Sequence, residues 1–319
     1  MIKKKILIFG ASGQIGRHLI RKLTKNYYKA ICQTRNSHKS IFLKTLGSIG
    51  YIDIVESSIF DQKKIIKFIE QSDICVNLIG ILFEKDKINT FNRIHTDFPN
   101  FISKTCNEKN KILIHLSAIA LSDKMNSKYA KSKINGEDKI KQNMTNYAII
   151  KPSVVFSVND NFTTRFMSLL NILPFFPMYY GGKTKFSPIH ASDLADLIYH
   201  IISKELYYKK EIEAVGPEVL DFNQIIKTLL KNINKRRILL NMPTSLGKMS
   251  AKILQMFPNP LLTIDQLELL KYDSIKTENG ISNFDIGFKS SISFEEGIQK
   301  YAYNWRDGGQ YSLKKYKNK

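Results

Sequence analysis

The chain has 319 residues, of which 43% are hydrophobic and 24% charged, so it is long enough to bury the core of one large α/β domain or of two domains that share a cleft. Lysine supplies 41 of the 49 basic residues, scattered along a chain that also holds 44 Ile and 24 Asn, so the net charge of +21 has the pattern of an AT-rich genome. A basic surface selected for a membrane or an acidic partner is the alternative. Because the sequence contains no nucleic-acid recognition motif, we expect no nucleic acid partner.

Two further exclusions come from the residue types. The three cysteines and six histidines lack the spacing of a disulfide framework or a ligand set, so we predict no metal. No apolar stretch approaches the ~18 residues of a membrane-spanning helix. We therefore expect a cytoplasmic protein that is soluble or peripheral.

Strand and helix patterns alternate over the first half of the chain. Apolar runs typical of buried parallel strands occupy residues 5–9, 29–34, 51–55, 74–79, 111–116 and 147–150. Apolar residues at helical spacing lie between them at 15–23, 63–69, 98–106 and 127–141. This alternation predicts an α/β fold with a doubly wound parallel sheet.

The alternation loosens after Pro152. We expect helices at 162–173, 192–203, 222–230 and 244–257, and a short strand at 211–215. Pro258 and Pro260 end the last of these helices, which is amphipathic. The pattern predicts a first domain at residues 1–155 and a smaller C-terminal α/β lobe at 156–319, packed on the first domain on the side of the substrate or partner.

A glycine-rich loop joins the first predicted strand to the first predicted helix. It consists of Gly10, Ala11, Ser12, Gly13, Gln14, Ile15 and Gly16. At a strand–helix junction this spacing predicts a Rossmann dinucleotide-binding loop: Gly10 makes the tight turn, Gly13 lets the backbone approach the pyrophosphate, and Gly16 lets the helix pack closely. The helix N-terminus then supplies N–H groups to the phosphates. Residues 1–155 are therefore expected to form an NAD(P)-binding Rossmann domain.

The end of the second strand distinguishes the two nicotinamide cofactors. A carboxylate there binds the ribose 2′-hydroxyl of NAD, whereas an arginine accommodates the 2′-phosphate of NADP. Residues 30–36 contain no Asp or Glu, and Arg35 lies where the phosphate would be, with Arg17 as a second candidate contact. We therefore favour NADP(H) over NAD(H). The alternative is that Arg35 is a solvated loop residue.

Further segments point to a family. They are NLIGILFE at 77–84, HLSAI at 115–119, SKYAKSK at 127–133, KPSVVF at 151–156, GGKT at 181–184, PIHASDLA at 188–195 and PLLTIDQ at 260–266. Together with the glycine loop they resemble the extended and atypical short-chain dehydrogenase/reductases, and among these the NAD(P)H-binding accessory subunits of respiratory complex I and their alphaproteobacterial relatives. The resemblance covers residues 4–311.

This resemblance implies particular cofactor contacts. Ser58 and Ile59 would lie near the adenine. The ribose side would be lined by Asn77, Leu78 and Gly80. The residues near the nicotinamide would be Pro152, Ser153 and Val154.

The resemblance also implies a catalytic set. Tyr129 and Lys133 match the Tyr-x-x-x-Lys pair of the superfamily, in which a tyrosinate moves a proton while the lysine lowers the tyrosine pKa and bonds the ribose. Ser117 would hold the substrate oxygen. Other Tyr and Lys residues share this spacing, so only the position of the pair favours it. Ser117 and Tyr129 are closer in sequence than in the better-known extended enzymes, which leaves cofactor contact without catalysis as an alternative.

Two functions follow from these observations. The first is an accessory or assembly component of complex I (NADH:ubiquinone oxidoreductase) that holds the cofactor structurally, contacts peripheral-arm subunits and lies peripherally on the cytoplasmic face of the inner membrane. The helix at 244–257 and the aromatic segment 175–180 would dock a partner or the membrane, or else belong to the core. The second function is a free NAD(P)-dependent reductase, epimerase or dehydratase that acts on a sugar nucleotide or a quinone-like carbonyl through Tyr129 and Lys133.

Overall fold

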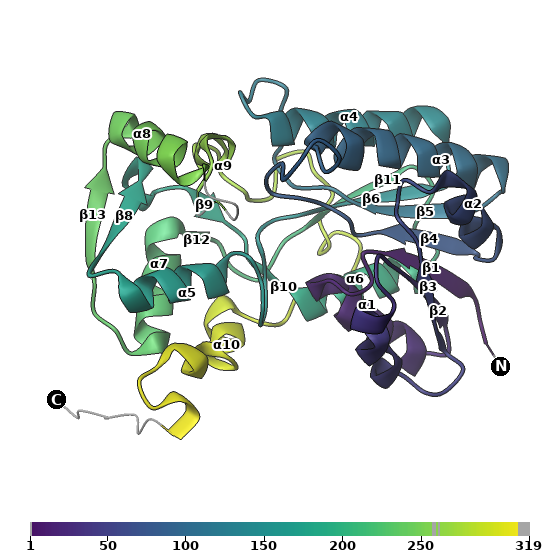
Figure 1. Ribbon diagram of the computed structural model, residues 1–319, viewed down its shortest axis with the longest axis horizontal. Coiled ribbons are helices and arrows are strands. Elements are labelled where there is room, and N and C mark those ends of the chain that lie inside the picture. Colours follow the sequence, from purple (N-terminus) through teal and green to yellow (C-terminus); the bar gives the residue numbers. More distant parts are fainter. Residues whose placement is uncertain (1, 257–259, 261, 312–319) are drawn as a thin grey trace.

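A seven-stranded parallel sheet forms the centre of the protein, for which a computed structural model describes residues 2–256, 260 and 262–311 (Figure 1). The strand order is β11-β6-β5-β4-β1-β2-β3. The strands are β1 Lys5–Phe9, β2 Lys29–Thr34, β3 Ile52–Glu56, β4 Ile74–Asn77, β5 Ile112–Leu116, β6 Tyr147–Pro152 and β11 Lys210–Ala214. The predicted doubly wound α/β fold is confirmed.

Helices cover both faces of this sheet because alternate strand residues point to opposite sides. Ile6 and Ile8 of β1 belong to one buried cluster, and Leu7 and Phe9 belong to the other. The first face carries α1 Gln14–Lys25, α6 Ala191–Ser203 and the 3₁₀ segment η1 His38–Leu46. The second face carries α2 Gln62–Glu70, α3 Phe98–Glu108 and α4 Lys128–Asn143, and a π-helical segment η2 Asn92–Asp97 leads into α3 (Figure 1).

The remaining helices and short strands form a smaller lobe beside the carboxyl ends of the strands (Figure 1). The helical segments of the lobe are α5 Thr163–Ile172, η3 Tyr180–Gly182, α7 Phe222–Ile233, α8 Thr244–Leu254, α9 Ile264–Leu269, α10 Phe294–Gln299, η4 Ala302–Trp305 and η5 Gly309–Tyr311. The strand pairs are β8 Phe175–Tyr179 with β13 Ile238–Met242, β7 Val155–Phe156 with β10 Ile189–His190, and β9 Lys185–Phe186 with β12 Leu220–Asp221. Edge-to-face aromatic contacts such as Phe166 with Phe176 and Phe222 fill its core.

The two segments considered for docking differ in burial. Residues 175–179 of the aromatic segment 175–180 form β8, in which Phe176 and Met178 are buried while Phe175 is 51% exposed. In α8, Leu246 and Met249 are exposed. The predicted helix end at Phe257 and Pro258 lies outside the described residues.

Two elements from the range expected as the C-terminal lobe lie with the central sheet. Helix α6 packs against α1, and β11 pairs in parallel with β6. Between two passages through the lobe, the chain therefore returns to the first domain and adds one helix and one strand to it.

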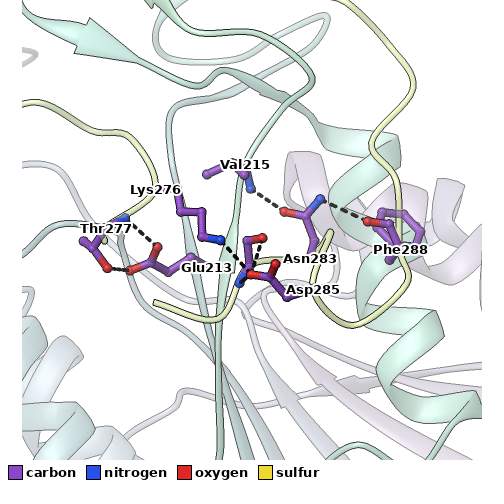
Figure 2. Close-up of polar contacts among 8 residues, drawn as sticks. Glu213, Val215, Lys276, Thr277, Asn283, Asp285 and Phe288 are labelled. Carbon is purple, nitrogen blue, oxygen red and sulfur yellow. Dashed lines mark hydrogen bonds and ion pairs between the residues drawn. The ribbon is translucent and has the colours of Figure 1, made fainter. Parts of the chain in front are cut away.

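A segment at residues 274–290 covers the outer edge of β11 (Figure 2). The Glu213 carboxylate accepts from the backbone N–H of Thr277 at 2.8 Å and from its hydroxyl at 2.6 Å. The Asn283 amide oxygen accepts from the Val215 N–H at 2.8 Å, and its amide nitrogen donates to the Phe288 carbonyl at 3.3 Å. The Glu213 N–H also donates to the Ile281 carbonyl at 2.7 Å, and the Glu213 carbonyl accepts from the Asn283 N–H at 3.0 Å. These two backbone bonds occupy groups that an open sheet edge would leave exposed, and all of these contacts fix the segment that leads toward the site.

Candidate functional site

The glycine loop has the geometry that a pyrophosphate requires. Gly10 has a φ of 81°, and the Gly13 N–H donates to the Gly10 carbonyl at 3.0 Å. A Cβ on Gly16 would lie 2.4 Å from the Ala11 carbonyl oxygen, so only glycine fits there. Helix α1 has no side-chain cap and no acidic residue in its first turn. Its first N–H groups are therefore available to an anion, so the loop fits the cofactor that the sequence predicted.

The end of β2 contains the residue predicted to select NADP. Arg35 is exposed directly after the strand and makes no hydrogen bond or ion pair with the described residues. The Thr34 hydroxyl beside it is buried without a partner. Sequence analysis overlooked Glu56 because it belongs to β3; the register pairs it with Thr34 and brings its carboxylate onto the Ser37 N–H at 2.7 Å. The bonds from Ser37 lower the Glu56 pKa, so this carboxylate is ionised but already occupied.

The loop after β3 holds the residues expected near the adenine. Ile59 is buried against the sheet, whereas Ser58 is exposed and its hydroxyl accepts from the Phe60 N–H at 3.2 Å. The Arg93 guanidinium covers the Phe60 ring at 4.2 Å. This contact holds the loop against the π-helical segment.

A cavity of about 430 Å³ lies where the carboxyl ends of the strands face the C-terminal lobe. Ten of the predicted site residues line it: Gln14, Ile15, Leu78, Gly80, Ser117, Tyr129, Lys133, Pro152, Ser153 and Val154. The predicted residues outside its lining are Gly10, Ser12, Gly13, Gly16, Arg35, Ser58, Ile59 and Asn77. The structure therefore brings the ribose, nicotinamide and catalytic candidates to one place.

Asn77 does not line the cavity. Its side chain is fully buried, and its amide nitrogen is 3.1 Å from His115 Nδ1. Its amide oxygen accepts from the Ile79 N–H at 3.1 Å. Asn77 thus fixes the ends of β4 and β5 and shapes the loop that lines the site.

Ser117 is buried and its hydroxyl donates to the Glu137 carboxylate. Glu137 is itself buried and pairs with the Lys151 ammonium at 2.9 Å, which pairs in turn with Glu211 at 2.6 Å. Because a serine hydroxyl has a single proton, Ser117 has none left to donate to a substrate oxygen in this arrangement.

Lys133 and Tyr129 share the cavity but are not bonded to each other. The Lys133 ammonium donates to the Leu116 carbonyl at 3.1 Å, and burial lowers its pKa to about 8 although Glu137 opposes the shift. The Tyr129 hydroxyl makes no hydrogen bond to any described residue. Burial, followed by the charge of Asp265, raises the pKa of Tyr129 to about 12, so the phenol is protonated at neutral pH.

His95 is a site residue that sequence analysis missed. It belongs to η2, and its Nε2 accepts from the Ile81 N–H at 3.1 Å while its Nδ1 lies 3.0 Å from the Ser132 hydroxyl. Its ring meets the Tyr129 ring edge to face at 5.3 Å. Burial lowers the His95 pKa to about 2, so the ring is neutral and orients both Tyr129 and the loop after β4. No local motif marks this residue.

Asp265 reaches the site from the C-terminal lobe. Its carboxylate accepts from the Ser127 hydroxyl at 2.8 Å, the Lys128 N–H at 2.6 Å and the Tyr129 N–H at 3.3 Å. These groups form the N-terminus of α4, where a negative charge is favourable. The PLLTIDQ segment contains Asp265, but the sequence did not indicate this role.

The residues expected near the nicotinamide join the two units. Backbone bonds hold Pro152 and Val154 between the neighbouring segments, and the Ser153 hydroxyl donates to the Ser274 carbonyl at 2.6 Å. Ser274 also lines the cavity. The segment that covers β11 therefore ends at the site.

Within residues 2–256, 260 and 262–311 the structure contains no cluster of three or more His, Cys, Asp or Glu side chains suited to a metal. In the same part of the chain, none of the helices combines the length and apolarity needed to cross a bilayer.

Comparison with known proteins places this geometry in a family. The sequence model of the RmlD substrate binding domain matches residues 4–215, which include all seven strands of the central sheet. The chain belongs to this family. A dTDP-glucose 4,6-dehydratase from Bacillus anthracis, solved in complex with NAD, superposes with a TM-score of 0.68 over 95% of this chain and 99% of its own, at 13% identity. At 13% identity, this structural similarity shows a shared fold alone.

Two relatives match nearly the whole chain. The mitochondrial NADH-ubiquinone oxidoreductase 40 kDa subunit of Neurospora crassa is 21% identical over 308 residues, or 96% of this chain and 80% of its own length. The mitochondrial NADH dehydrogenase (ubiquinone) 1 alpha subcomplex subunit 9 of Dictyostelium discoideum is 26% identical over 306 residues, or 94% of this chain and 85% of its own. The expected resemblance to accessory subunits of complex I is confirmed, and it includes the C-terminal lobe.

Proposed function

We propose that this protein is an accessory or assembly component of complex I that holds NADP(H) as a structural cofactor. The whole-length similarity to two subunits of NADH:ubiquinone oxidoreductase supports the partner. The uncapped N-terminus of α1, which follows the glycine loop, supports binding of a dinucleotide. The structurally similar dTDP-glucose 4,6-dehydratase was solved in complex with NAD, which agrees with this. In this role the protein lies on the cytoplasmic face of the inner membrane and contacts peripheral-arm subunits.

The unpaired Arg35 supports NADP(H) over NAD(H). A guanidinium at the end of β2 suits a 2′-phosphate, and the carboxylate of Glu56, which pairs with Thr34 across the sheet, is bound to Ser37. In the proposed contacts, Gly10, Ser12, Gly13 and Gly16 surround the pyrophosphate. Lys133 bonds the nicotinamide ribose once it exchanges its bond to Leu116 for one to the cofactor.

The observation that carries the structural role is that the expected proton donors are not prepared for catalysis. The Ser117 hydroxyl donates to Glu137, and Lys133 donates to a backbone carbonyl. The pKa of Tyr129 is raised to about 12, whereas a tyrosinate mechanism needs it lowered. A site that binds a cofactor without this preparation suits retention of the cofactor better than turnover.

Identification of the native cofactor tests this function. The protein is purified from its own cells, the bound nucleotide is released and identified, and carbonyl compounds and quinones are then offered as oxidants. We expect NADPH that remains unconsumed. Bound NAD(H) would contradict the Arg35 assignment, and rapid consumption of the cofactor would contradict the structural role.

The partner is tested separately by affinity purification under mild extraction. We expect complex I subunits to co-purify with the tagged protein and to remain attached to the membrane fraction. Recovery of the protein alone, under conditions that keep complex I assembled, would contradict the accessory role.

One observation favours a second function, a free reductase, epimerase or dehydratase. The Tyr129 hydroxyl is free of hydrogen bonds to described residues and shares the cavity with Lys133, as a catalytic pair must. The Tyr129→Phe variant decides this alternative. Loss of NADPH-dependent turnover in that variant would support an enzyme, and unchanged turnover would exclude this pair.

A further inference from the structure

Part of the cavity lining is not assigned to the cofactor. It includes six apolar side chains from both units: Leu82 and Met125 from the first domain, and Phe162, Phe186, Leu269 and Leu270 from the C-terminal lobe. The polar residues that the lobe adds to this lining are Asn161, Tyr272, Asp273 and Ser274. Burial of apolar ligand surface against the apolar side chains is favourable.

Charged groups are scarce in this wall. Among the described residues that line the cavity, Lys133 is the single cation and Asp273 the single carboxylate. Lys133 already donates to the Leu116 carbonyl at 3.1 Å, and Asp273 accepts from the Lys185 N–H at 2.8 Å. A nucleoside diphosphate sugar would bring two negative charges into a cavity whose lining has one lysine and one carboxylate, and therefore no net positive charge. Desolvation of these charges without paired cations is costly.

The neutral polar groups of the wall are also largely occupied. Gln14 donates to the Ser157 hydroxyl at 2.8 Å, Ser117 donates to Glu137, and Ser153 donates to the Ser274 carbonyl at 2.6 Å. Three side-chain donors of the lining, those of Tyr129, Asn161 and Tyr272, have no hydrogen bond to the described residues. Asn161 and Tyr272 are exposed, so Tyr129 is the free donor that is shielded from solvent. An apolar wall with such a donor is the arrangement that recognises an acceptor atom on an apolar molecule.

We propose that this cavity binds, beside the cofactor, an uncharged, largely apolar carbonyl compound, whose oxygen accepts from the Tyr129 hydroxyl, and that it rejects sugar nucleotides. This proposal rests on the proposed function only in that the cofactor occupies the part of the cavity lined by its assigned residues. It requires neither turnover nor complex I.

Three probes test the ligand class by saturation-transfer NMR on the whole protein, with and without NADP⁺. They are 4-phenylbutan-2-one, which is apolar with one carbonyl, butylbenzene, which lacks the carbonyl, and dTDP-glucose. We expect the ketone to bind more tightly than butylbenzene, and dTDP-glucose to leave the ketone bound at equal concentration. Absence of ketone binding, or its displacement by dTDP-glucose, would overturn the proposal. Release and identification of the native cofactor tests the proposed function independently of these results.

Two variants locate the ligand. Leu269→Asp places a charge in the apolar wall and is expected to weaken ketone binding at least tenfold, since burial of a charge costs more than about 1.4 kcal/mol. Ile264→Asp, on the same helix but outside the cavity lining, is the matched control and should change binding less than twofold. Leu82→Asp at the half-exposed rim repeats the test if Leu269→Asp does not fold by circular dichroism. Ketone binding that withstands a charge in the wall would sink the idea.

The donor is tested with Tyr129→Phe. Loss of one hydrogen bond should weaken ketone binding by about two- to tenfold and leave butylbenzene binding unchanged. An equal effect on both probes would show that the carbonyl does not contact Tyr129, and would overturn that part of the proposal.

Discussion

The glycines of the cofactor loop differ in how much space surrounds them. A Cβ on Gly16 would lie 2.4 Å from the Ala11 carbonyl oxygen and 2.7 Å from that of Gly10, and both are backbone atoms. A Cβ on Gly13 would meet only the Gly10 carbonyl, at 3.1 Å, and Gly13 has an ordinary φ of −71°. Close packing of α1 on the loop is therefore the reason for Gly16, whereas access of a ligand to the backbone is the reason for Gly13.

This difference gives a prediction for stability without cofactor. We expect Gly16→Ala to lower the free energy of unfolding by about 1–3 kcal/mol, because the backbone of α1 must shift. Gly13→Ala, the matched control, should cost less than about 1 kcal/mol. Urea unfolding followed by circular dichroism measures both. Equal losses would contradict the assigned difference in space.

Burial of Lys133 makes stability depend on pH. Its pKa is lowered from 10.5 to about 8 in the folded protein, so below pH 8 the buried charge destabilises the fold by about 3 kcal/mol. Between pH 8 and 10.5 the folded state has lost this proton while the unfolded state still binds it. Stability contributed by this group therefore rises with pH across that window.

The expected signature is a difference between two curves of unfolding free energy against pH, measured without cofactor. Below pH 8, Lys133→Met should have a higher unfolding free energy than the wild type. This difference should decrease by up to about 3 kcal/mol between pH 8 and 10.5. Lys131→Met, at an exposed lysine of the same helix, is the control and should not follow this slope. Parallel curves for Lys133→Met and the wild type would show that Lys133 is not desolvated.

At the scale of elements, α4 depends on a residue from the other lobe. Asp265 accepts three hydrogen bonds at the start of this helix, and its charge contributes to the raised pKa of Tyr129. Asp265 lies in the first turn of α9, and the capping box formed by Thr263 and Gln266 fixes the start of this helix. The position of the candidate catalytic tyrosine is therefore set by both units.

Asp265→Ala is expected to lower the unfolding free energy by about 1–2 kcal/mol, because the first N–H groups of α4 lose their acceptor. Hydrogen exchange should become faster at residues 127–130. Glu268→Gln is the control on the same helix, since Glu268 makes a local pair with Lys271 that is worth at most about 0.5 kcal/mol. Unchanged exchange in Asp265→Ala would mean that the lobe does not hold this helix.

The elements also show what could be predicted from sequence. The inner strands β1, β4, β5 and β6 are mostly apolar because both of their faces are buried, so the pattern located them within a few residues. The edge strands β3 and β11 mix apolar and charged residues, and their predicted bounds differ from the observed ones by one residue. The pair β8 and β13 was missed, because Pro177 interrupts β8 and its partner lies far along the chain. The site residues also fall into a predicted group and a missed group. Residues in local motifs, such as Gly16 and Lys133, were predicted, whereas His95 and Asp265 act through tertiary packing that no local pattern records.

At the scale of the whole molecule, the two units are joined through the site itself. Gln14 of α1 bonds Ser157, Ser153 bonds Ser274, and Asp265 bonds the start of α4. A ligand in the cavity therefore touches both units, and we expect them to unfold as one. The single tryptophan, Trp305, reports on this because it lies in η4 of the lobe, away from the cavity lining.

NADPH at 100 times its dissociation constant should stabilise the native state by about 2.7 kcal/mol. If the units are coupled, thermal transitions followed by Trp305 fluorescence and by far-ultraviolet circular dichroism should coincide and should rise together when NADPH is added. A Trp305 transition that stays at its cofactor-free midpoint while the circular dichroism transition moves would mean that the lobe unfolds independently. In that case the bonds of Gln14, Ser153 and Asp265 would position the site without coupling its two halves.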